Sequence, residues 1–581
     1  MKKYKFFALA FAALTLGACS SDDVVDNGQG GAEWNSEGKG YINLAINLPT
    51  QASTRANDKF DDGTPEEYDV QNATLILFAG GKVNSAYDMN LNFSQEGSST
   101  DNITTTAKIT QEINSMDGDV QALVVLNHNN VFTVTAQNDL MVGGTSMKGK
   151  DVAGLNDAIN AEITADDNWH TNGFLMSNAV LATAAGGTTA PTTATAVTLV
   201  DIDETKIHES AAEAQGDPAA NIYVERAESK VTLIASNGNT TETNMAYTID
   251  GWALDNTNNS SKLVRTVAEF DTWKAYKSNA TTLVDQYRFI GSDKVGESVD
   301  GTTSYYRVYW GDDYNYDAAP AGSFTTVGGG VIADDDLNKS VNGTVASYCF
   351  ENTMNFANMI EANATRVIVK ATFNGGNPFY VVDGDKATIW TAADAGQEAA
   401  ARLLNNPEFN AWAEANLTPG EILSSDTDFD VVLSTTAGTA TVTSITLNDA
   451  GQAKLKADAA EYPTNAADLA NSEINLLYYA GGESYYSVWV NHFGEDGTPW
   501  DAGETQAPSA GNIYPGGEAN YLGRWGMLRN NWYELTVTSI RALGDPTVST
   551  VTTEPIDKKE SYISVSINVL SWAKRTQNVE L

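Results

Sequence analysis

Apolar and polar residues alternate over many short stretches of the chain. Between Tyr41 and Leu48 every second residue is Ile or Leu, and the residues between them are Asn, Ala or Tyr. A period of two places the apolar side chains on one face of a β-strand. Similar stretches, bounded by Gly, Asn and Asp, are Ala73–Phe78, Val120–Leu126, Lys230–Ile234, Arg366–Phe373, Tyr485–Val490, Trp532–Ile540 and Tyr562–Leu570. The pattern predicts a mainly β protein.

Helical patterning is sparse and is confined to Lys150–Ala161 and to Asp394–Asn405 continuing towards Asn410–Ala415. Many short strands with long polar connections are typical of β-sandwich domains. A chain of 581 residues is long enough for two or three domains. Gly and Pro punctuate the sequence at Gln215–Pro218, just before a new strand. We therefore expect an N-terminal β-sandwich domain at residues 56–220 and a C-terminal one at 221–581.

The first residues have the layout of a secretory signal. Three lysines precede an apolar run, Phe6–Leu16, which is too short to span a bilayer. The Leu16–Cys19 stretch resembles the lipobox of bacterial lipoproteins, so we expect a signal peptide at residues 1–18 and lipidation of Cys19. An ordinary signal peptide with an incidental cysteine is the alternative. One further cysteine, far along the chain, provides no disulfide framework.

The charge of the chain limits its partners. The formal net charge is -41, while 42% of the residues are hydrophobic. An acidic surface repels nucleic acid and anionic lipid headgroups, so neither is an expected partner. The hydrophobic content argues against disorder as the cause of the acidity. Together with the signal layout and Cys19, these values predict a folded, extracytoplasmic protein that is attached to the membrane by its lipid.

A polar segment after the first strand contains an isolated arginine. Arg55 is the first arginine of the chain, and the next is Arg226. Polar, turn-prone segments are exposed and easily cleaved. We therefore expect an arginine-specific protease to cut between Arg55 and Ala56. The propeptide, residues 19–55, would then carry away the strand at 41–48, whose apolar face consists of Ile42, Leu44, Ile46 and Leu48.

The last predicted strand is similar to the first one. Tyr562–Val569 aligns with Tyr41–Leu48, and Tyr, both Ile and the Asn are identical. Half-buried strands often look alike, so chance similarity stays open. The functional interpretation is that residues 562–570 of one subunit fill the place that strand 41–48 of another subunit leaves. The inserted side chains would be Ile563, Val565, Ile567 and Val569.

Local motifs for catalysis, cofactors or metals are incomplete. Gly144–Asp151 is close to a phosphate-binding loop but has Asp where Ser or Thr should hold magnesium. Asp313–Asp317 has the first spacings of a calcium loop without its glycine and distal glutamate, and Asp426–Asp430 fails in the same way. The four histidines have no zinc-ligand spacing. We expect no catalytic, cofactor-binding or metal-binding residue; a secreted hydrolase built from distant residues remains an alternative.

Several segments, spread over nearly the whole chain, resemble the fimbrillins, the shaft subunits of type V pili of Gram-negative anaerobes. The similarity is to the major shaft subunit of Mfa-type (minor) fimbriae, although Glu228-Ser229 stands where small apolar residues are expected. The matching segments are Gly173–Asn178, Val224–Val231, Gly251–Asn258, Tyr348–Thr353, Thr365–Val367, Gly526–Tyr533 and Val569–Trp572.

The resemblance implies two transthyretin-like β-sandwich domains, with long loops and a few short helices, and no cofactor. It implies export through the periplasm as an outer-membrane lipoprotein, maturation at an arginine, and strand exchange into a head-to-tail filament of identical subunits. Expected partners are the fimbrial tip and anchor subunits and receptors on host or bacterial surfaces. A fimbrial tip adhesin or a surface glycan-binding lipoprotein is the alternative, since twelve Trp would suit sugar stacking.

Overall fold

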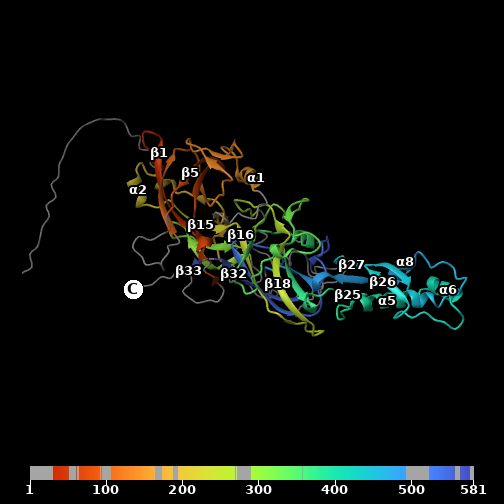
Figure 1. The fold of residues 1–581 in the computed structure, drawn as a ribbon. Coiled ribbons are helices and arrows are strands. Elements are labelled where there is room, and N and C mark those ends of the chain that lie inside the picture. The colour runs from red at the N-terminus through yellow and green to blue at the C-terminus, as the bar shows by residue number, and fades with distance from the viewer. Residues whose placement is uncertain are drawn as a thin grey trace, which may run out of the picture.

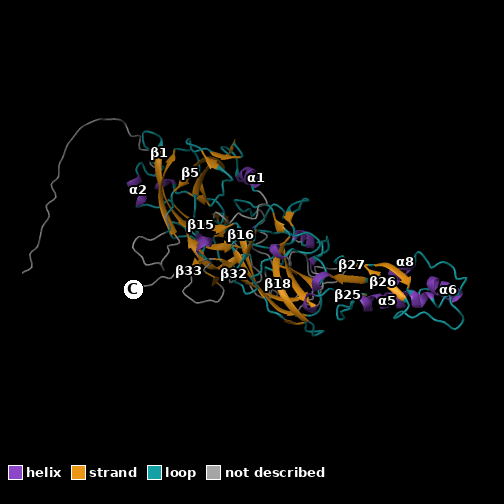
Figure 2. Ribbon diagram, in the orientation of Figure 1, coloured by secondary structure: helices purple, strands orange, loops and turns teal. Residues whose placement is uncertain are grey.

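The computed structural model describes residues 31–51, 60–61, 64–91, 93, 106–163, 173–186, 194–267, 270, 289–355, 358–492, 522–556, 563–572 and 574–575. The described elements form three regions in a row, coloured orange, green to blue, and cyan in Figure 1. Strands predominate and the helices are short (Figure 2), which confirms the prediction of a mainly β protein. No helix of the described residues is long and apolar enough to cross a membrane.

The first region is built on one sheet in which β1 is an inner strand. β1 runs parallel to β15 and antiparallel to β6. The two outer strands approach each other, because the backbone N–H of Asn114 donates to the hydroxyl of Tyr87 at 2.8 Å. In order across the sheet the strands are β5 (Lys82–Met89), β4 (Ala73–Ala79), β7 (Val120–Leu126), β11 (Met176–Asn178), β15 (Ala220–Arg226), β1 (Lys39–Asn47) and β6 (Thr106–Asn114), with β14 (Val200–Asp201) beside β7.

Both faces of this sheet carry a core. On one face Leu44 and Leu75 belong to the same buried cluster, whereas Ile76 and Leu123 pack on the other face with Leu155. The second face is covered by α1 (Val152–Glu162) and by a small sheet of β8 (Thr133–Val134), β9 (Leu140–Val142) and β10 (Thr145–Ser146). The predicted helix near Lys150–Ala161 is therefore α1.

The second region is a sandwich of two sheets. Val231 and Leu535 of one sheet share a core with Val369 and Phe373 of the other. One sheet contains β23 (Ser347–Phe350), β16 (Glu228–Ile234), β31 (Asn531–Ile540), β32 (Ile563–Trp572) and β3 (Phe60–Asp61). The other contains β17 (Gly238–Asn239), β18 (Ala246–Asp255), β24 (Arg366–Phe373) and β30 (Glu483–Trp489).

The chain passes from the first sheet to the sandwich at Ala227, because β15 ends at Arg226 and β16 begins at Glu228. The expected division between 220 and 221 therefore falls at the first residues of β15. Shorter elements lie outside these sheets. These are β12 (Leu181–Ala182), β13 (Ala196–Val197), β20 (Ile290–Glu297) and β21 (Ser304–Val308) in one sheet, β19 (Thr257–Asn258) with β22 (Phe324–Thr325), β2 (Thr50–Gln51) with β33 (Lys574–Arg575), and α2 (Ala211–Gln215). The 3-10 helices are η1 (Pro65–Tyr68), η2 (Glu204–Lys206), η3 (Asp334–Asp336), η5 (Glu361–Asn363), η6 (Asn374–Gly376) and η7 (Ala480–Gly482).

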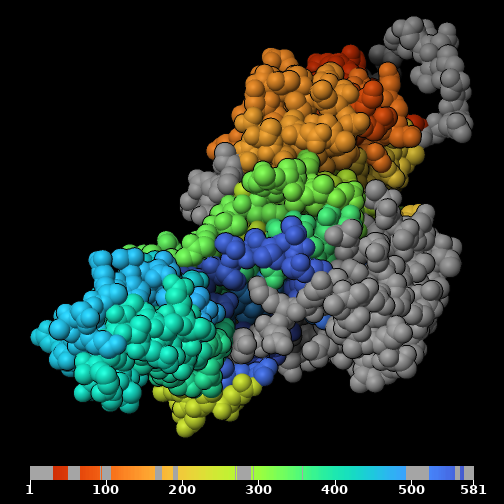
Figure 3. Space-filling view, turned by 90° about the vertical axis from the view of Figure 1, so that its right-hand side faces the viewer, coloured from red at the N-terminus to blue at the C-terminus, as the bar shows by residue number. Residues whose placement is uncertain are grey.

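The third region is an insertion between β24 and β30, which pair with each other in the sandwich. The chain leaves and returns through two glycine pairs, Gly375-Gly376 and Gly481-Gly482, all with positive φ, which glycine adopts without strain. In Figure 3 this region projects from the rest of the molecule. It contains β25 (Phe379–Val382), α5 (Ala392–Asn405), α6 (Pro407–Asn416), β26 (Phe429–Leu433), β27 (Gly438–Ala440), β28 (Val442–Leu447), α7 (Asp449–Gln452), α8 (Ala466–Glu473) and β29 (Leu476–Tyr479).

The insertion has its own core but is attached firmly to the sandwich. Along β25, Tyr380 and Val382 face the core of the insertion, while Phe379 and Val381 face the core of the sandwich. α5 and α6 lie where the sequence predicts helices. The expectation of two sandwiches with loops did not include this α/β unit, although its helices were predicted.

Candidate functional site

The first strand has the buried face that the alternation predicts. Ile42, Leu44 and Ile46 are 0% exposed and Leu48 is 3% exposed, all within the core of the first region. β1 pairs with β6 along its whole length, from Lys39 opposite Asn114 to Asn47 opposite Thr106. Removal of this strand would therefore open an apolar groove between β6 and β15.

The opposite face of β1 is also covered, which the sequence did not predict. The Asn43 amide donates to the carbonyl of Gln215 in α2 at 2.9 Å, and the Asn43 carbonyl accepts from the N–H of Ala219 at 2.8 Å. Asn43 and Ala45 are buried there. Tyr41 forms a bridge with His208, whose ring lies 3.1 Å from a carboxylate oxygen of Asp217. The segment that includes α2 thus closes over β1.

The stabilisation by β1 is large compared with the stability of one domain. Four buried aliphatic side chains contribute about 6–12 kcal/mol, at about 1.5–3 kcal/mol each, as an upper estimate. Ladder hydrogen bonds add about 1 kcal/mol each. A typical domain is stable by about 5–15 kcal/mol. The first region therefore needs a strand in the position of β1 to stay stable, and that strand can come from the same chain or from another.

The C-terminal strand β32 has a more open position. It runs antiparallel to β31 from Ile563 opposite Ile540 to Ser571 opposite Asn531. Ile563 is buried, whereas Val565 and Ile567 are half-buried against the sandwich core. The side chain of Val569 lies outside the described residues, as does Tyr562. Among the described strands, only β3 pairs with the other edge of β32, and only at Ser571 and Trp572.

A buried ionic cluster holds the chain just after the predicted cleavage segment. Glu67 of η1 is 1% exposed, and its carboxylate lies 2.9 Å from the Lys230 ammonium and accepts from the Tyr348 hydroxyl at 2.8 Å. Its backbone carbonyl accepts from two guanidinium nitrogens of Arg226, at 3.0 and 2.9 Å. Burial, and then the negative charge of Glu67, raise the pKa of Tyr348, which therefore stays a hydrogen-bond donor.

Glu67 was missed by the sequence reasoning because its partners lie far along the chain. A local signal does exist, since Thr64 and Glu67 have the spacing of a capping box. The Glu67 carboxylate accepts from the backbone N–H of Thr64 at 3.1 Å, and η1 begins directly after Thr64. This pattern could have predicted a fixed turn here but not its burial at the junction of two regions.

A second buried cluster joins the first region to the sandwich. Arg265 lies 3.0 Å from Glu225 of β15 and 3.1 Å from Glu351, which also pairs with Arg529 at 3.0 Å. All four charged groups are nearly fully buried. Burial lowers the pKa of Arg529, while the adjacent Glu351 carboxylate opposes that shift. Loss of one partner would leave the other charge buried and unpaired, so the contact between the two regions at this cluster is stabilising only while the pairs are intact.

The residues predicted for lipidation and for proteolytic cleavage lie outside the part of the chain that the structure describes. Cys19, Arg55 and Ala56, and the signal and propeptide up to residue 30, lie outside the described residues. The flanks of residues 52–59 are described, as β2 on one side and β3 on the other. Lipidation and cleavage therefore remain predictions.

The incomplete calcium loop is a hydrogen-bonded turn. Asp313 accepts from the N–H groups of Thr353 at 2.8 Å and Asn315 at 2.7 Å, and from the Asn258 amide at 3.0 Å. Burial raises the pKa of Asp313 to about 7. Among the residues that the structure describes, no three His, Cys, Asp or Glu side chains are grouped as ligands for a metal ion.

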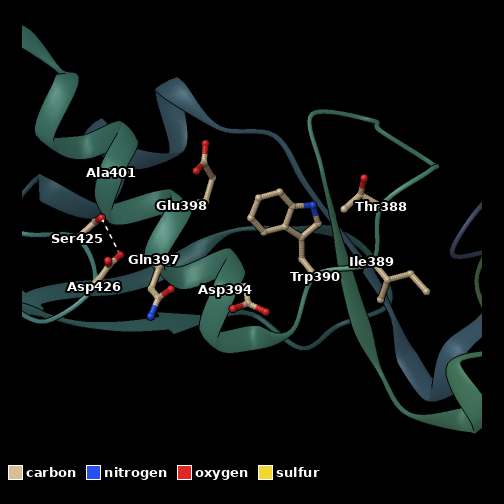
Figure 4. A pocket seen from close by; sticks show the side chains of 9 residues that line it. All are labelled: Thr388, Ile389, Trp390, Asp394, Gln397, Glu398, Ala401, Ser425 and Asp426. Carbon is tan, nitrogen blue, oxygen red and sulfur yellow. Dashed lines mark hydrogen bonds between the residues drawn. The ribbon is translucent and has the colours of Figure 1, made fainter.

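A pocket lies on the insertion beside Trp390 (Figure 4). Its volume is about 360 Å³, and its wall includes the indole and three carboxylates. Each carboxylate has a partner within the chain: Asp394 accepts from the Thr391 hydroxyl, Glu398 pairs with Arg402, and Asp426 accepts from the Ser425 hydroxyl. An indole face with hydroxyl and carboxylate groups suits a hydroxyl-rich ligand such as a sugar.

The C-terminal region matches a known family. Residues 512–578 match the model for the C-terminal part of fimbrillin, the major fimbrial subunit protein type IV. No curated protein sequence matches the chain. The match includes β31 and β32, of which the sequence analysis connected β32 with assembly, and it supports a structural or adhesive role in a fimbrium.

Solved structures of fimbrial proteins resemble the chain weakly. A fimbrilin from Porphyromonas gingivalis is 12% identical, with a TM-score of 0.35, over 92% of this chain and 99% of that one. The tip fimbrial protein Mfa3 of the same organism is 10% identical, with a TM-score of 0.24, over 92% and 100%. A fimbrial assembly protein from Parabacteroides distasonis is 11% identical, with a TM-score of 0.22, over 57% and 99%. The match at residues 512–578 is to the C-terminal part of the fimbrillin family, the family that the sequence segments resemble.

Proposed function

We propose that this chain is a shaft subunit of a cell-surface fimbrium. It is exported through the periplasm as a lipoprotein anchored in the outer membrane by Cys19, and an arginine-specific protease cuts it after Arg55. The mature subunits then join head to tail by strand exchange, together with tip and anchor subunits, and the fimbrium contacts receptors on host or bacterial surfaces. This role needs no catalysis by the protein.

The observation that carries the proposal is the position of β1. The strand is an inner strand of its sheet, with four side chains no more than 3% exposed, yet it is followed by a polar segment with an isolated arginine. An empty place between β6 and β15 would be an apolar slot with two open strand edges, which favours pairing with another strand. Filling it from a second chain is β-augmentation.

The geometry of such a join favours a filament. The donor, β32, lies in the sandwich, and the acceptor groove lies in the first region, so donor and acceptor are different surfaces. Contacts between different surfaces of identical subunits are heterologous, and they propagate into an open filament when the rotation between subunits does not close a ring. Donation requires β32 to leave β31, since the two strands pair within one chain.

The test compares the purified wild type with Arg55→Ala and Arg55→Lys after limited digestion by an arginine-specific protease. Arg55→Lys is the matched control, because it keeps the charge and removes only the recognition of the bond. Fragment masses identify the cut, since the exposed Arg402 and Arg541 are also accessible. We expect only the wild type to lose residues up to Arg55 and to form denaturant-resistant ladders on unboiled gels and filaments by electron microscopy.

A clean cut that leaves the wild type monomeric, even at high concentration, would contradict the shaft role. It would favour the second candidate, a tip adhesin or glycan-binding lipoprotein. The specific observation for that candidate is the pocket beside Trp390, where an indole and hydroxyl groups line one cavity.

A further inference from the structure

Both flanks of the predicted cleavage segment pair with the C-terminal end of the same chain. β2 runs parallel to β33, with Thr50 opposite Lys574 and Gln51 opposite Arg575. β3 runs parallel to the end of β32, with Phe60 opposite Ser571 and Asp61 opposite Trp572. Two short strands from either side of residues 52–59 therefore pair with the C-terminal tail, at residues 571–572 and 574–575.

Each of these pairings is short and parallel, and by itself it is weak. β2 and β3 are joined through residues 52–59, so when one of them pairs with the tail, the other is kept near its own pairing partner. Two linked contacts of this kind bind far more tightly than either one alone, because the second forms at a high effective concentration. The intact segment thus works as a two-point clamp on the tail.

The two arms of the clamp belong to different parts of the molecule. β2 follows Leu48 and Pro49 directly, so it continues the buried β1. β3 precedes η1, where Glu67 is fixed by Lys230 and Tyr348 at the junction. A cut after Arg55 leaves β2 with the leader and β3 with the body. The bivalent clamp then becomes two separate single contacts.

We propose that the uncut leader restrains the C-terminal tail of its own chain, and that cleavage releases the tail. This inference rests on the proposed cleavage after Arg55. It means that a single cut prepares both halves of the join: β1 becomes free to leave its groove, and the end of β32 becomes free to reach the groove of a second copy. An uncut subunit is then blocked as a donor as well as an acceptor.

Hydrogen exchange of the tail tests this inference on the full-length chain. Peptides that cover 571–575 are followed by mass spectrometry before and after cutting of the wild type. We expect exchange to become about tenfold faster after the cut, which corresponds to about 1.4 kcal/mol. Gln51→Pro removes a backbone donor from β2, and its uncut tail should already exchange at the fast rate. Ser53→Pro, placed between the two paired stretches, is the matched control and should behave as the uncut wild type.

Equal exchange of the tail before and after the cut overturns the inference, whatever the variants do. Slow exchange of β1 and β6 peptides in Gln51→Pro verifies that the variant is folded. Filament formation is scored in the same samples and separates the two ideas. Released tails without filaments contradict the proposed shaft role, while filaments without any change in tail exchange contradict the clamp.

Discussion

β1 and β32 have nearly the same pattern of residues but very different surroundings. Each alternates Ile, Val or Leu with small or polar residues. β1 lies between β6 and β15, and its apolar side chains are within 3% of complete burial. Among the described strands, β32 has β31 on one edge and only the short β3 on the other, and Ile567 is half-buried. The position in the sheet, rather than the strand's own sequence, decides how much each strand contributes to stability. The open position of β32 therefore suits a donor strand, and the enclosed position of β1 suits an acceptor groove.

The largest expected effect comes from placing a charge in each strand. Ile46→Asp puts a carboxylate into a site that is 0% exposed, so we expect the free energy of unfolding to fall by at least about 4 kcal/mol. Ile567→Asp, in the half-buried position of β32, should cost about 1–2 kcal/mol, since its carboxylate can reach water. Urea unfolding of both uncut variants measures the difference. Equal losses would show that the two positions are equally enclosed and would break the comparison.

A smaller effect is expected at the anchor beside β1. Glu67→Gln leaves the Lys230 ammonium buried without its carboxylate, so we expect a loss of about 3 kcal/mol. Lys230→Met added to Glu67→Gln should restore much of that loss, because the ammonium that had lost its carboxylate is then absent. A double-mutant cycle in urea gives the coupling. Additive losses would mean that Glu67 fixes the chain after β1 by some contact other than this ion pair.

The smallest expected effect, taken per pH unit, is a pH dependence in the sheet that holds β32. Burial raises the pKa of Glu228 on β16 to about 8, from 4.5. The folded state therefore holds a proton that the unfolded state loses above about pH 4.5. Its stabilising contribution is complete below that pH and disappears as the pH rises through 8, with a slope of at most about 1.4 kcal/mol per pH unit.

Urea unfolding at several values between pH 5 and 8 measures this slope, and Glu228→Gln is the matched control. Asp313 contributes in the same direction, since burial raises its pKa to about 7. The neighbouring Cys349 and Tyr348 stay neutral in this range because burial raises the pKa of each. We expect the glutamine variant to lose most of the slope above pH 7. An unchanged slope would assign the effect to Asp313.

Much of the local structure followed from the sequence because it depends on neighbouring residues. The alternation at Ile42, Leu44, Ile46 and Leu48 predicted both a strand and its buried face, and the pattern at Asp394–Asn405 predicted α5. The parallel pairing of β1 with β15 brings Leu44 beside Ala220, and no local pattern encodes such a distant register.

Other features were hidden for the same reason. The cover of α2 over Asn43 and the cluster around Glu67 depend on side chains that only the fold brings together. The insertion was missed because β24 and β30 each look like an ordinary strand, and nothing in either one indicates that the chain between them folds separately. Within the predicted site, the two strands and the burial of β1 could be derived from the sequence. The ionic cluster around Glu67, just after the predicted cleavage segment, could not.

The insertion between β24 and β30 has a consequence for any polymer of this chain. Its first strand, β25, contributes side chains to the sandwich core as well as to the core of the insertion, so the insertion is packed against the body at its base. In the filament proposed above, one insertion would project from every subunit, at regular intervals along the filament. Weak contacts made by single insertions would then act together, and avidity would rise with the length of the filament rather than with the strength of any one contact.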